Sequence, residues 1–314
     1  MHVVITGAAG FLGQRLARKL LQNDSVRSLT LADIIPPPGP THPKVKRIQA
    51  DLTNPQAAKD IIHSDTTTVY HLAAVVSGQA EANFDLGIKV NCDGTRHLLE
   101  AIRHQAPGAK FIFASSLAVF GGNLPDTLFE STAVTPQSSY GTQKAICELW
   151  ANDYARKGFV DSRVLRLPTV CVRPGKPNAA ASSFASSIIR EPLNNETAIC
   201  PVNPNLQLWL SSPNAVTNNL IHAMTIEARQ FGPSRTVNLP GITVSVQEMI
   251  DSLHRIAGAD TAQRIRYKPN EAIAQIVESW PAKFDTSRAA DLGFSGDRTF
   301  DDIIKSFINE NPNQ

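Results

Sequence analysis

The chain has 314 residues, of which 42% are hydrophobic and 18% charged, so it can bury a large core and is not an intrinsically disordered protein. Lysine and arginine number 30 against 28 aspartate and glutamate residues, and no basic stretch is interleaved with aromatic side chains. Nucleic acid and membrane surfaces are therefore disfavoured as partners. The length and composition predict one α/β core with a modest appended lobe.

The first residues and the cysteines favour a cytoplasmic protein. Residues 1–7 consist of a short apolar run that ends in a glycine, and they lack the charged and apolar regions of a signal peptide. No apolar run is long enough to span a bilayer. The four cysteines stand apart and lack the Cys-x-x-Cys or Cys/His spacings of zinc and redox sites. We expect buried, reduced thiols, a cytoplasmic location and no metal site.

Short apolar runs alternate with amphipathic stretches from residue 2 to about residue 170. The expected strands are residues 3–6, 28–32, 45–49, 69–72, 110–115 and 164–167. Helical periodicity falls between most of them, at residues 12–22, 56–63, 84–105 and 140–156. This alternation predicts an α/β fold with a doubly wound parallel sheet, in which ligands bind beyond the carboxyl ends of the strands.

The alternation becomes less regular after Arg173-Pro174-Gly175. Beyond that point we expect helices at residues 180–190, 213–229 and 246–257, and short strands at residues 207–210 and 236–239. We therefore divide the chain into a nucleotide-binding domain, residues 1–175, and a smaller C-terminal α/β lobe for the substrate, residues 176–314.

Three glycines at intervals of three lie directly between the first strand and the first helix. Gly7 permits a tight turn, Gly10 lets backbone N–H groups approach a pyrophosphate, and Gly13 lets the helix pack on the strand. With Phe11 and Leu12, they place the N-terminus of the helix at the phosphates. The motif predicts dinucleotide binding. The spacing of the glycines alone is also compatible with an ordinary strand-to-helix turn that binds no ligand.

An acidic residue completes the dinucleotide fingerprint. Asp33 ends the second strand about twenty residues beyond Gly13, where its carboxylate can accept from the adenosine ribose hydroxyls. The same carboxylate would repel a 2′-phosphate, so NAD is favoured over NADP. Arg15 is a competing signal for NADP, although an isolated arginine on a helix is more often solvated. Asp51 and Leu52 can flank the adenine, and Asp51 is equally suited to cap the next helix.

Tyr140 and Lys144 lie four residues apart on an expected helix, so both side chains project from one face. An ammonium beside a phenol lowers the pKa of the phenol, which creates a base that can accept a proton from a hydroxyl group. Ser116, at the end of the fifth strand, can hold the same substrate oxygen. The alternatives are a surface salt bridge for Lys144 and a turn or cap for Ser116.

Together these residues resemble the extended short-chain dehydrogenase/reductase family, which is the NAD-dependent epimerase/dehydratase superfamily, over nearly the whole chain. Besides the glycine motif and the Ser116, Tyr140 and Lys144 set, the matching motifs are His71-Leu72-Ala73-Ala74, Asn91 with Gly94-Thr95, Val119-Phe120-Gly121, and Asp285-x-Ser287-Arg288 with Leu292-Gly293-Phe294. The resemblance implies a Rossmann domain and an enzyme.

The resemblance also implies residue roles. Tyr140 would be the catalytic base and acid, Lys144 would hold the nicotinamide ribose, and Ser116 would orient the reacting hydroxyl. Relatives form homodimers through the two helical stretches at residues 84–105 and 140–156, and we expect the same here. The further cofactor contacts are assigned to Leu72, Ala73, Ala74, Ser77, Asn91, Pro168 and Val170.

The chain departs from the nucleotide-sugar enzymes of the family at residues 208–213. Those enzymes carry a basic and aromatic segment that binds the nucleotide diphosphate, whereas this chain has Leu208-Trp209-Leu210-Ser211-Ser212-Pro213. We therefore expect a smaller substrate. Residues 74–78, 140–148 and 166–178 are most similar to the D-erythronate dehydrogenase group, which implies NAD-dependent oxidation of the C2 hydroxyl of a four-carbon sugar acid.

A sugar acid needs a cation for its carboxylate and short polar groups for its hydroxyls. Arg173, Lys176 and Asn178 follow the sixth strand and can serve this purpose, or they can belong to a solvated loop. His71 is expected to be a packed strand residue, because Tyr140 already fills the role of base. The complete expected substrate set is Ser77, Ser116, Leu117, Tyr140, Thr169, Arg173, Lys176 and Asn178.

Two other functions remain open at this point. A nucleotide-sugar epimerase or dehydratase would reduce and reoxidise bound NAD within one turnover, so it would release no free NADH. An NAD-sensing regulator would show no turnover, and regulators of this superfamily usually lack the tyrosine and lysine pair.

Overall fold

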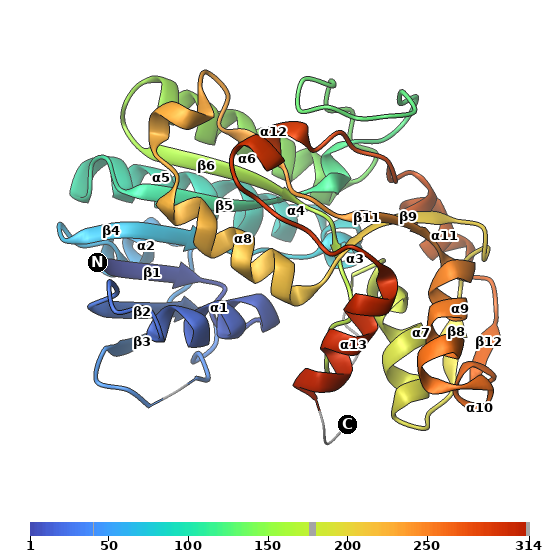
Figure 1. The fold of residues 1–314 in the computed structure, drawn as a ribbon. Helices are drawn as coiled ribbons and strands as arrows, with labels where there is room; N and C mark the ends of the chain where they lie inside the picture. Colours follow the sequence, from blue (N-terminus) through green and yellow to red (C-terminus); the bar gives the residue numbers. More distant parts are fainter. Residues whose placement is uncertain (40, 176–179, 312–314) are drawn as a thin grey trace. The chain divides into compact units, whose positions relative to one another are not determined.

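The computed structural model describes residues 1–39, 41–175 and 180–311 (Figure 1). Its largest sheet has seven strands in the order β10-β6-β5-β4-β1-β2-β3. The five strands from β5 to β3 pair in parallel, and the order reverses between β1 and β4. The bounds of these strands are β1 (His2–Thr6), β2 (Ser28–Asp33), β3 (Val45–Gln49), β4 (Thr66–His71), β5 (Lys110–Ser116), β6 (Asp161–Leu167) and β10 (Thr236–Asn238).

Helices cover both faces of this sheet (Figure 1), as expected for a doubly wound fold. Buried apolar residues of α2, α5 and α6 form one core with β1, β4, β5 and β6. Helix α1 and helix α8 lie on the opposite face. The bounds are α1 (Phe11–Leu21), α2 (Pro55–Ile61), α3 (Ser77–Ala82), α4 (Phe84–Gly87), α5 (Gly94–Gln105), α6 (Ser139–Arg156) and α8 (Pro213–Thr225).

The long helix predicted at residues 84–105 is interrupted by a π-helical segment, η1 (Ile88–Asp93), between α4 and α5. Helix α2 begins with Pro55 at its first position, and the side chain of Asn54 accepts a hydrogen bond from the backbone N–H of Gln56. Asp51, the alternative cap considered from the sequence, instead accepts from the N–H of Thr53 at 2.9 Å.

The chain forms two compact units, and each consists of separate stretches of sequence. The first unit contains Met1–Ser116, Ser139–Arg166 and Thr217–Val237. The second contains Leu117–Ser138, Leu167–Val216 and Asn238–Gln314. This organisation differs from a single division between residues 175 and 176, because most of α8 and β10 belong to the first unit.

Strand β10 was expected in the C-terminal lobe, and this expectation is wrong: the strand joins the edge of the large sheet beside β6. A short apolar run does not indicate which sheet it will join.

Three cations of the first unit bind the carbonyl groups at and after the end of α8, where the helix dipole favours positive charge. Lys110 donates to Met224 at 2.5 Å, Arg163 to Ile226 at 2.9 Å and Arg235 to Ala228 at 2.6 Å.

The second unit contains two small sheets, β11-β9-β7 and β12-β8, with helices packed on a separate apolar core. The fold prediction of a parallel Rossmann-type sheet with smaller C-terminal sheets is confirmed. The strands are β7 (Thr169–Val170), β8 (Ala198–Cys200), β9 (Gln207–Ser211), β11 (Ile242–Ser245) and β12 (Ile265–Tyr267). The helices are α7 (Ser183–Leu193), α9 (Val246–Ala257), α10 (Ala259–Ala262), α11 (Glu271–Glu278), α12 (Ser287–Asp291) and α13 (Phe300–Glu310).

All four cysteines are buried and free, as expected. Within the described ranges, no helix is both long enough and apolar enough to cross a membrane. The same ranges hold no group of three histidine, cysteine, aspartate or glutamate side chains that could bind a metal ion.

Candidate active site

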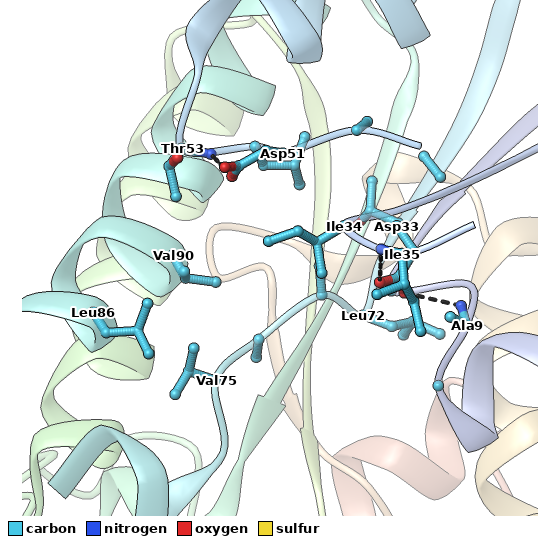
Figure 2. A pocket seen from close by; sticks show the side chains of 18 of the residues that line it. Ala9, Asp33, Ile34, Ile35, Asp51, Thr53, Leu72, Val75, Leu86 and Val90 are labelled. Carbon is cyan, nitrogen blue, oxygen red and sulfur yellow. Dashed lines mark hydrogen bonds between the residues drawn. The ribbon is translucent and has the colours of Figure 1, made fainter. Parts of the chain in front are cut away.

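A cavity of about 570 Å³ lies in the first unit, at the carboxyl ends of β1, β2 and β4 (Figure 2). This is the point where the strand order reverses, which is where open α/β sheets bind their ligands. Eight residues predicted to contact the cofactor line it: Gly7, Gly10, Asp33, Asp51, Leu52, Leu72, Ala73 and Ala74.

Glycine occupies the three positions of the first loop for different structural reasons. Gly7 has φ +72°, and a Cβ added there would lie 2.5 Å from the backbone nitrogen of Ala73. A Cβ at Gly13 would lie 2.7 Å from the Cα of Ala8, so the helix could not pack on the loop. At Gly10 a Cβ would meet only the carbonyl oxygen of Gly7, at 3.2 Å. Gly7 and Gly13 are thus needed for packing, whereas Gly10 leaves the backbone open to a ligand.

The N-terminus of α1 has the properties of an anion site. Gly10 is the capping residue and carries no side chain to bind the first N–H groups, and the first turn, which begins Phe11-Leu12-Gly13, has no acidic residue. These N–H groups and the helix dipole can therefore serve a phosphate group.

The carboxylate of Asp33 is fixed beside this loop. One oxygen accepts from the backbone N–H of Ala9 at 2.9 Å, and the other accepts from the N–H of Ile35 at 3.4 Å (Figure 2). A carboxylate can accept further hydrogen bonds, so Asp33 keeps the capacity to bind a ribose. Its placement fits an adenosine ribose next to a pyrophosphate on α1.

Apolar side chains form much of the remaining wall of the cavity, and the sequence analysis did not identify them. Apolar residues carry no distinctive chemistry, so only the structure places them at a ligand site. Those labelled in Figure 2 come from the residues directly after β2 and from the segments that follow β4: Ile34, Ile35, Val75, Leu86 and Val90. This lining suits the flat face of a nucleobase.

Ser116, Tyr140 and Lys144 come together in the first unit, from the end of β5 and the first two turns of α6. The side chain of Ser116 forms a hydrogen bond with the phenol of Tyr140. Burial raises the pKa of Tyr140 to about 12, and the hydrogen bond with Ser116 acts in the opposite direction. Tyr140 therefore needs a nearby positive charge to act as a base near neutral pH.

Lys144 is a buried cation close to the ring of Tyr140. Its ammonium group donates to the carbonyl oxygen of Ala114 at 2.8 Å, and it lies 4.5 Å from the centre of the Phe113 ring and 5.6 Å from the centre of the Tyr140 ring. Burial lowers the pKa of Lys144 to about 8, whereas Cys147, Glu148 and Cys92 raise it. The surface salt bridge considered for Lys144 is therefore excluded by its burial.

His71 is a packed strand residue, as expected. Its two ring nitrogens bind the hydroxyl groups of Thr6 at 2.7 Å and Thr95 at 2.9 Å, and the ring stacks on Phe113. Burial lowers the pKa of His71 to about 3, and the positive charge of Lys144 adds to this effect. His71 is therefore neutral at physiological pH.

Asn91 does not line the cavity but fixes one of its walls. In η1, its amide accepts from the N–H of Val75 at 2.8 Å, donates to the carbonyl of Val75 at 3.0 Å, and donates to Gln143 at 2.7 Å. Asn91 therefore holds the loop after β4 in place. Ser77, predicted to contact cofactor or substrate, is the buried first residue of α3.

The other predicted residues belong to the second unit. Leu117 is buried in a short 3₁₀-helix, and Pro168 immediately precedes β7, which consists of Thr169 and Val170. Two further members of the expected substrate set, Lys176 and Asn178, lie outside the described residues.

Arg173 is held through its backbone by α7. Its N–H donates to the hydroxyl of Ser186 at 3.0 Å, and its carbonyl accepts from the guanidinium of Arg190 at 2.7 Å. Burial lowers the pKa of Arg173, and the like charge of Arg190 contributes to this shift. Within the described part of the chain, no carboxylate forms an ion pair with Arg173.

Comparison with known proteins identifies the family of this chain. Residues 3–209 match the NAD dependent epimerase/dehydratase family. The chain is 50% identical to the D-erythronate dehydrogenase of Haemophilus influenzae over 98% of this chain and 99% of that protein. It is 48% identical to the D-erythronate dehydrogenase of Cupriavidus necator over 99% and 98% of the two chains.

A solved structure has the same fold along nearly the whole chain. It is described as the nucleoside-diphosphate-sugar epimerase from Agrobacterium tumefaciens, is 41% identical and superposes with a TM-score of 0.94, covering 99% of this chain and 94% of that one. The family resemblance inferred from the motifs is thus confirmed, and the chain belongs to the NAD-dependent epimerase/dehydratase family.

Proposed function

We propose that the protein is an NAD-dependent dehydrogenase that oxidises the C2 hydroxyl of D-erythronate, or of a similar four-carbon aldonate, to the 2-oxo acid. The observation that carries this proposal is the convergence of Ser116, Tyr140 and buried Lys144 in one site. The names of the two full-length relatives support the substrate class.

The residues around the cavity fit NAD. The N-terminus of α1 would bind the pyrophosphate, Asp33 the adenosine ribose, and the apolar wall with Leu52 and Val90 the adenine. Lys144 would hold the nicotinamide ribose, and Ser77, Pro168 and Val170 remain predicted contacts of the nicotinamide half. When bound, NAD supplies the acceptor for the hydride.

The chain's own residues would move the proton. Ser116 donates to the substrate oxygen and holds it beside Tyr140, and the ionised phenol of Tyr140 accepts the hydroxyl proton. The ammonium of Lys144 lowers the free energy of that phenolate in a buried site, where charges interact strongly. Arg173 would bind the carboxylate of the sugar acid, since a guanidinium can bind both oxygens at once.

A substrate screen tests the proposal. The enzyme is incubated with NAD and a set of four- to six-carbon aldonic acids, and the formation of NADH is followed. We expect D-erythronate or a close four-carbon relative to give the highest kcat/KM. If no aldonate releases NADH while a nucleotide sugar is epimerised, the enzyme is an epimerase. If nothing is turned over and the protein still binds NAD, the result favours an NAD-sensing regulator.

We predict a preference for NAD over NADP of about a hundredfold in kcat/KM, because a 2′-phosphate would lie against the carboxylate of Asp33. Asp33→Asn removes the charge and leaves an oxygen that can accept from Ala9. It should weaken NAD and reduce the preference to about tenfold or less. Asp51→Asn, in the same cavity, is the control and should leave the ratio unchanged. Equal efficiency of the wild type with both cofactors would refute the assignment of Asp33.

We also propose a homodimer formed through α4, α5 and α6. Phe84 and Leu149 are 60% and 67% exposed on these helices, whereas Ile146, Trp150 and Tyr154 pack partly on the core of their own unit. Large apolar residues that are exposed in a single subunit are typical of a subunit interface.

The oligomeric state is measured by sedimentation at micromolar concentration, where we expect a dimer. Leu149→Glu should shift the protein toward monomer by placing a charge in the interface. Tyr267→Ser, which changes an exposed aromatic residue of β12, is the control and should leave the dimer intact. A wild-type monomer would contradict the proposal.

A further inference from the structure

Helix α6 carries a buried carboxylate one turn beyond Lys144. Glu148 accepts hydrogen bonds from the hydroxyl of Ser115 at 2.5 Å and from the guanidinium of Arg166, with the shortest contact at 2.7 Å. The Nε of Arg166 also lies 2.9 and 3.1 Å from the two carboxylate oxygens. Ser115 belongs to β5 and Arg166 to β6, so Glu148 links α6 to two strands of the sheet.

These contacts lie next to the catalytic groups in the chain. Lys144 donates to the carbonyl of Ala114, and Glu148 accepts from the next residue, Ser115, which directly precedes Ser116. Two successive residues of β5 are thus bound by side chains one helical turn apart on α6. This double attachment fixes the distance between the strand end that carries Ser116 and the helix that carries Tyr140.

Stability alone does not explain an ion pair at this position. Lys144, Glu148 and Arg166 are only 3%, 4% and 6% exposed. Removing charges from water is costly, and well-packed apolar residues of similar volume often replace a buried ion pair without loss of stability. A role in the chemistry of the neighbouring site accounts for the placement of charged residues here.

The groups that face Lys144 differ in the charge they can provide. His71 on β4 is neutral, and the hydrogen bond with Cys147, together with burial, raises the pKa of the Cys92 thiol on η1. Tyr140 carries a negative charge only when it acts as the base. The Cys147 thiol, whose pKa is lowered by its hydrogen bond with Cys92, and the Glu148 carboxylate, which pairs with Arg166, both favour the ammonium form of Lys144. Of the two, Glu148 also links α6 to β5 and β6.

We propose that Glu148 is a positioning residue that aligns α6 with the end of β5 and keeps Lys144 in its ammonium form beside Tyr140. The inference rests on the proposed function, because it assumes that protonated Lys144 assists Tyr140. It adds a residue that acts through Lys144 and contacts neither substrate nor cofactor.

The test replaces Glu148 by glutamine, which keeps the shape and removes the charge. Loss of a nearby negative charge disfavours the ammonium, so the pKa of Lys144 should fall by about one unit below its wild-type value. The titration of Lys144 is read directly by NMR of lysine-labelled protein without cofactor, with Lys144→Ala to assign the signal. The high-pH limb of the kcat profile should move to lower pH in the same variant.

Two controls separate charge from structure. Asp153→Asn makes the same chemical change at an exposed position of α6 and should leave the titration of Lys144 unchanged. Cys147→Ser removes the neighbouring thiol, and the shift caused by Glu148→Gln should persist in that background. If the glutamine variant does not fold, the double variant Glu148→Met with Arg166→Met removes both charges together. Loss of the Arg166 cation offsets part of the effect, so the pKa of Lys144 should fall by less than in Glu148→Gln.

An unchanged Lys144 titration in a folded Glu148 variant overturns the inference, and so does a Glu148→Gln shift that disappears in the Cys147→Ser background. Failure of the proposed function is a different result: the wild-type enzyme would then form no NADH with any aldonate. The NMR titration does not depend on activity, so the two failures can be distinguished.

Discussion

Replacing Tyr140 by phenylalanine should lower kcat by about 10² to 10⁴, the usual contribution of proton transfer by a positioned side chain. The substitution removes the phenolic oxygen and leaves the ring, which lies beside the ammonium of Lys144. NAD binding should therefore change little. The measurement is kcat from steady-state kinetics, together with the Kd of NADH from fluorescence.

Arg173→Ala acts on the carboxylate of the substrate and Tyr140→Phe on its reacting hydroxyl, so the two substitutions should change different kinetic constants. Arg173→Ala should raise KM for the aldonate with a smaller change in kcat, because it removes a contact with a group that does not react. Tyr140→Phe with near-normal kcat would eliminate the proposed base. An unchanged KM in Arg173→Ala would show that the carboxylate binds elsewhere.

Replacing Gly7 by alanine should destabilise the protein by about 3 kcal/mol or more, from backbone strain and overpacking together. The new Cβ would lie 2.5 Å from the nitrogen of Ala73 and 2.6 Å from the carbonyl carbon of Leu72, both of them backbone atoms. Because Leu72 and Ala73 line the cofactor cavity, affinity for NADH should also be lost. Thermal or denaturant unfolding measures the first effect, and fluorescence titration the second.

Gly158 provides a matched control. It also has φ +72°, but a Cβ there would meet nothing within 4 Å. Gly158→Ala should therefore cost only the strain of the left-handed backbone, about 1 to 2 kcal/mol, and leave NADH binding intact. If the two variants are equally destabilised, the close approach of Gly7 to the loop after β4 is not what requires glycine.

The predicted site residues that the structure brings together are mostly those encoded by neighbouring positions in the sequence. The glycine loop combines a turn, a close approach and a helix start within seven residues, and Tyr140 and Lys144 share a helix face through their spacing. Asp33 could be identified because it ends a strand at a fixed distance from the glycines. Local physics is sufficient for each of these predictions.

Other features depend on contacts between distant segments and could not be predicted in this way. Asn91 was assigned to the cofactor, but its amide binds Val75 and Gln143. The link between Glu148 and Arg166 joins residues 18 positions apart through the packing of a helix on the sheet. Neither the residue type nor the spacing distinguishes such a buried polar pair from solvated side chains.

The alternation of the chain between its two units means that neither is a separable module. The first unit takes its last strand, β10, and most of α8 from residues 217–237, beyond a long stretch that belongs to the second. A fragment that ends at residue 175 would lack one edge of the large sheet, and β6 would become an unprotected edge strand, which is prone to intermolecular pairing. Neither proteolysis at one site nor recombination at one boundary can therefore separate the two units intact.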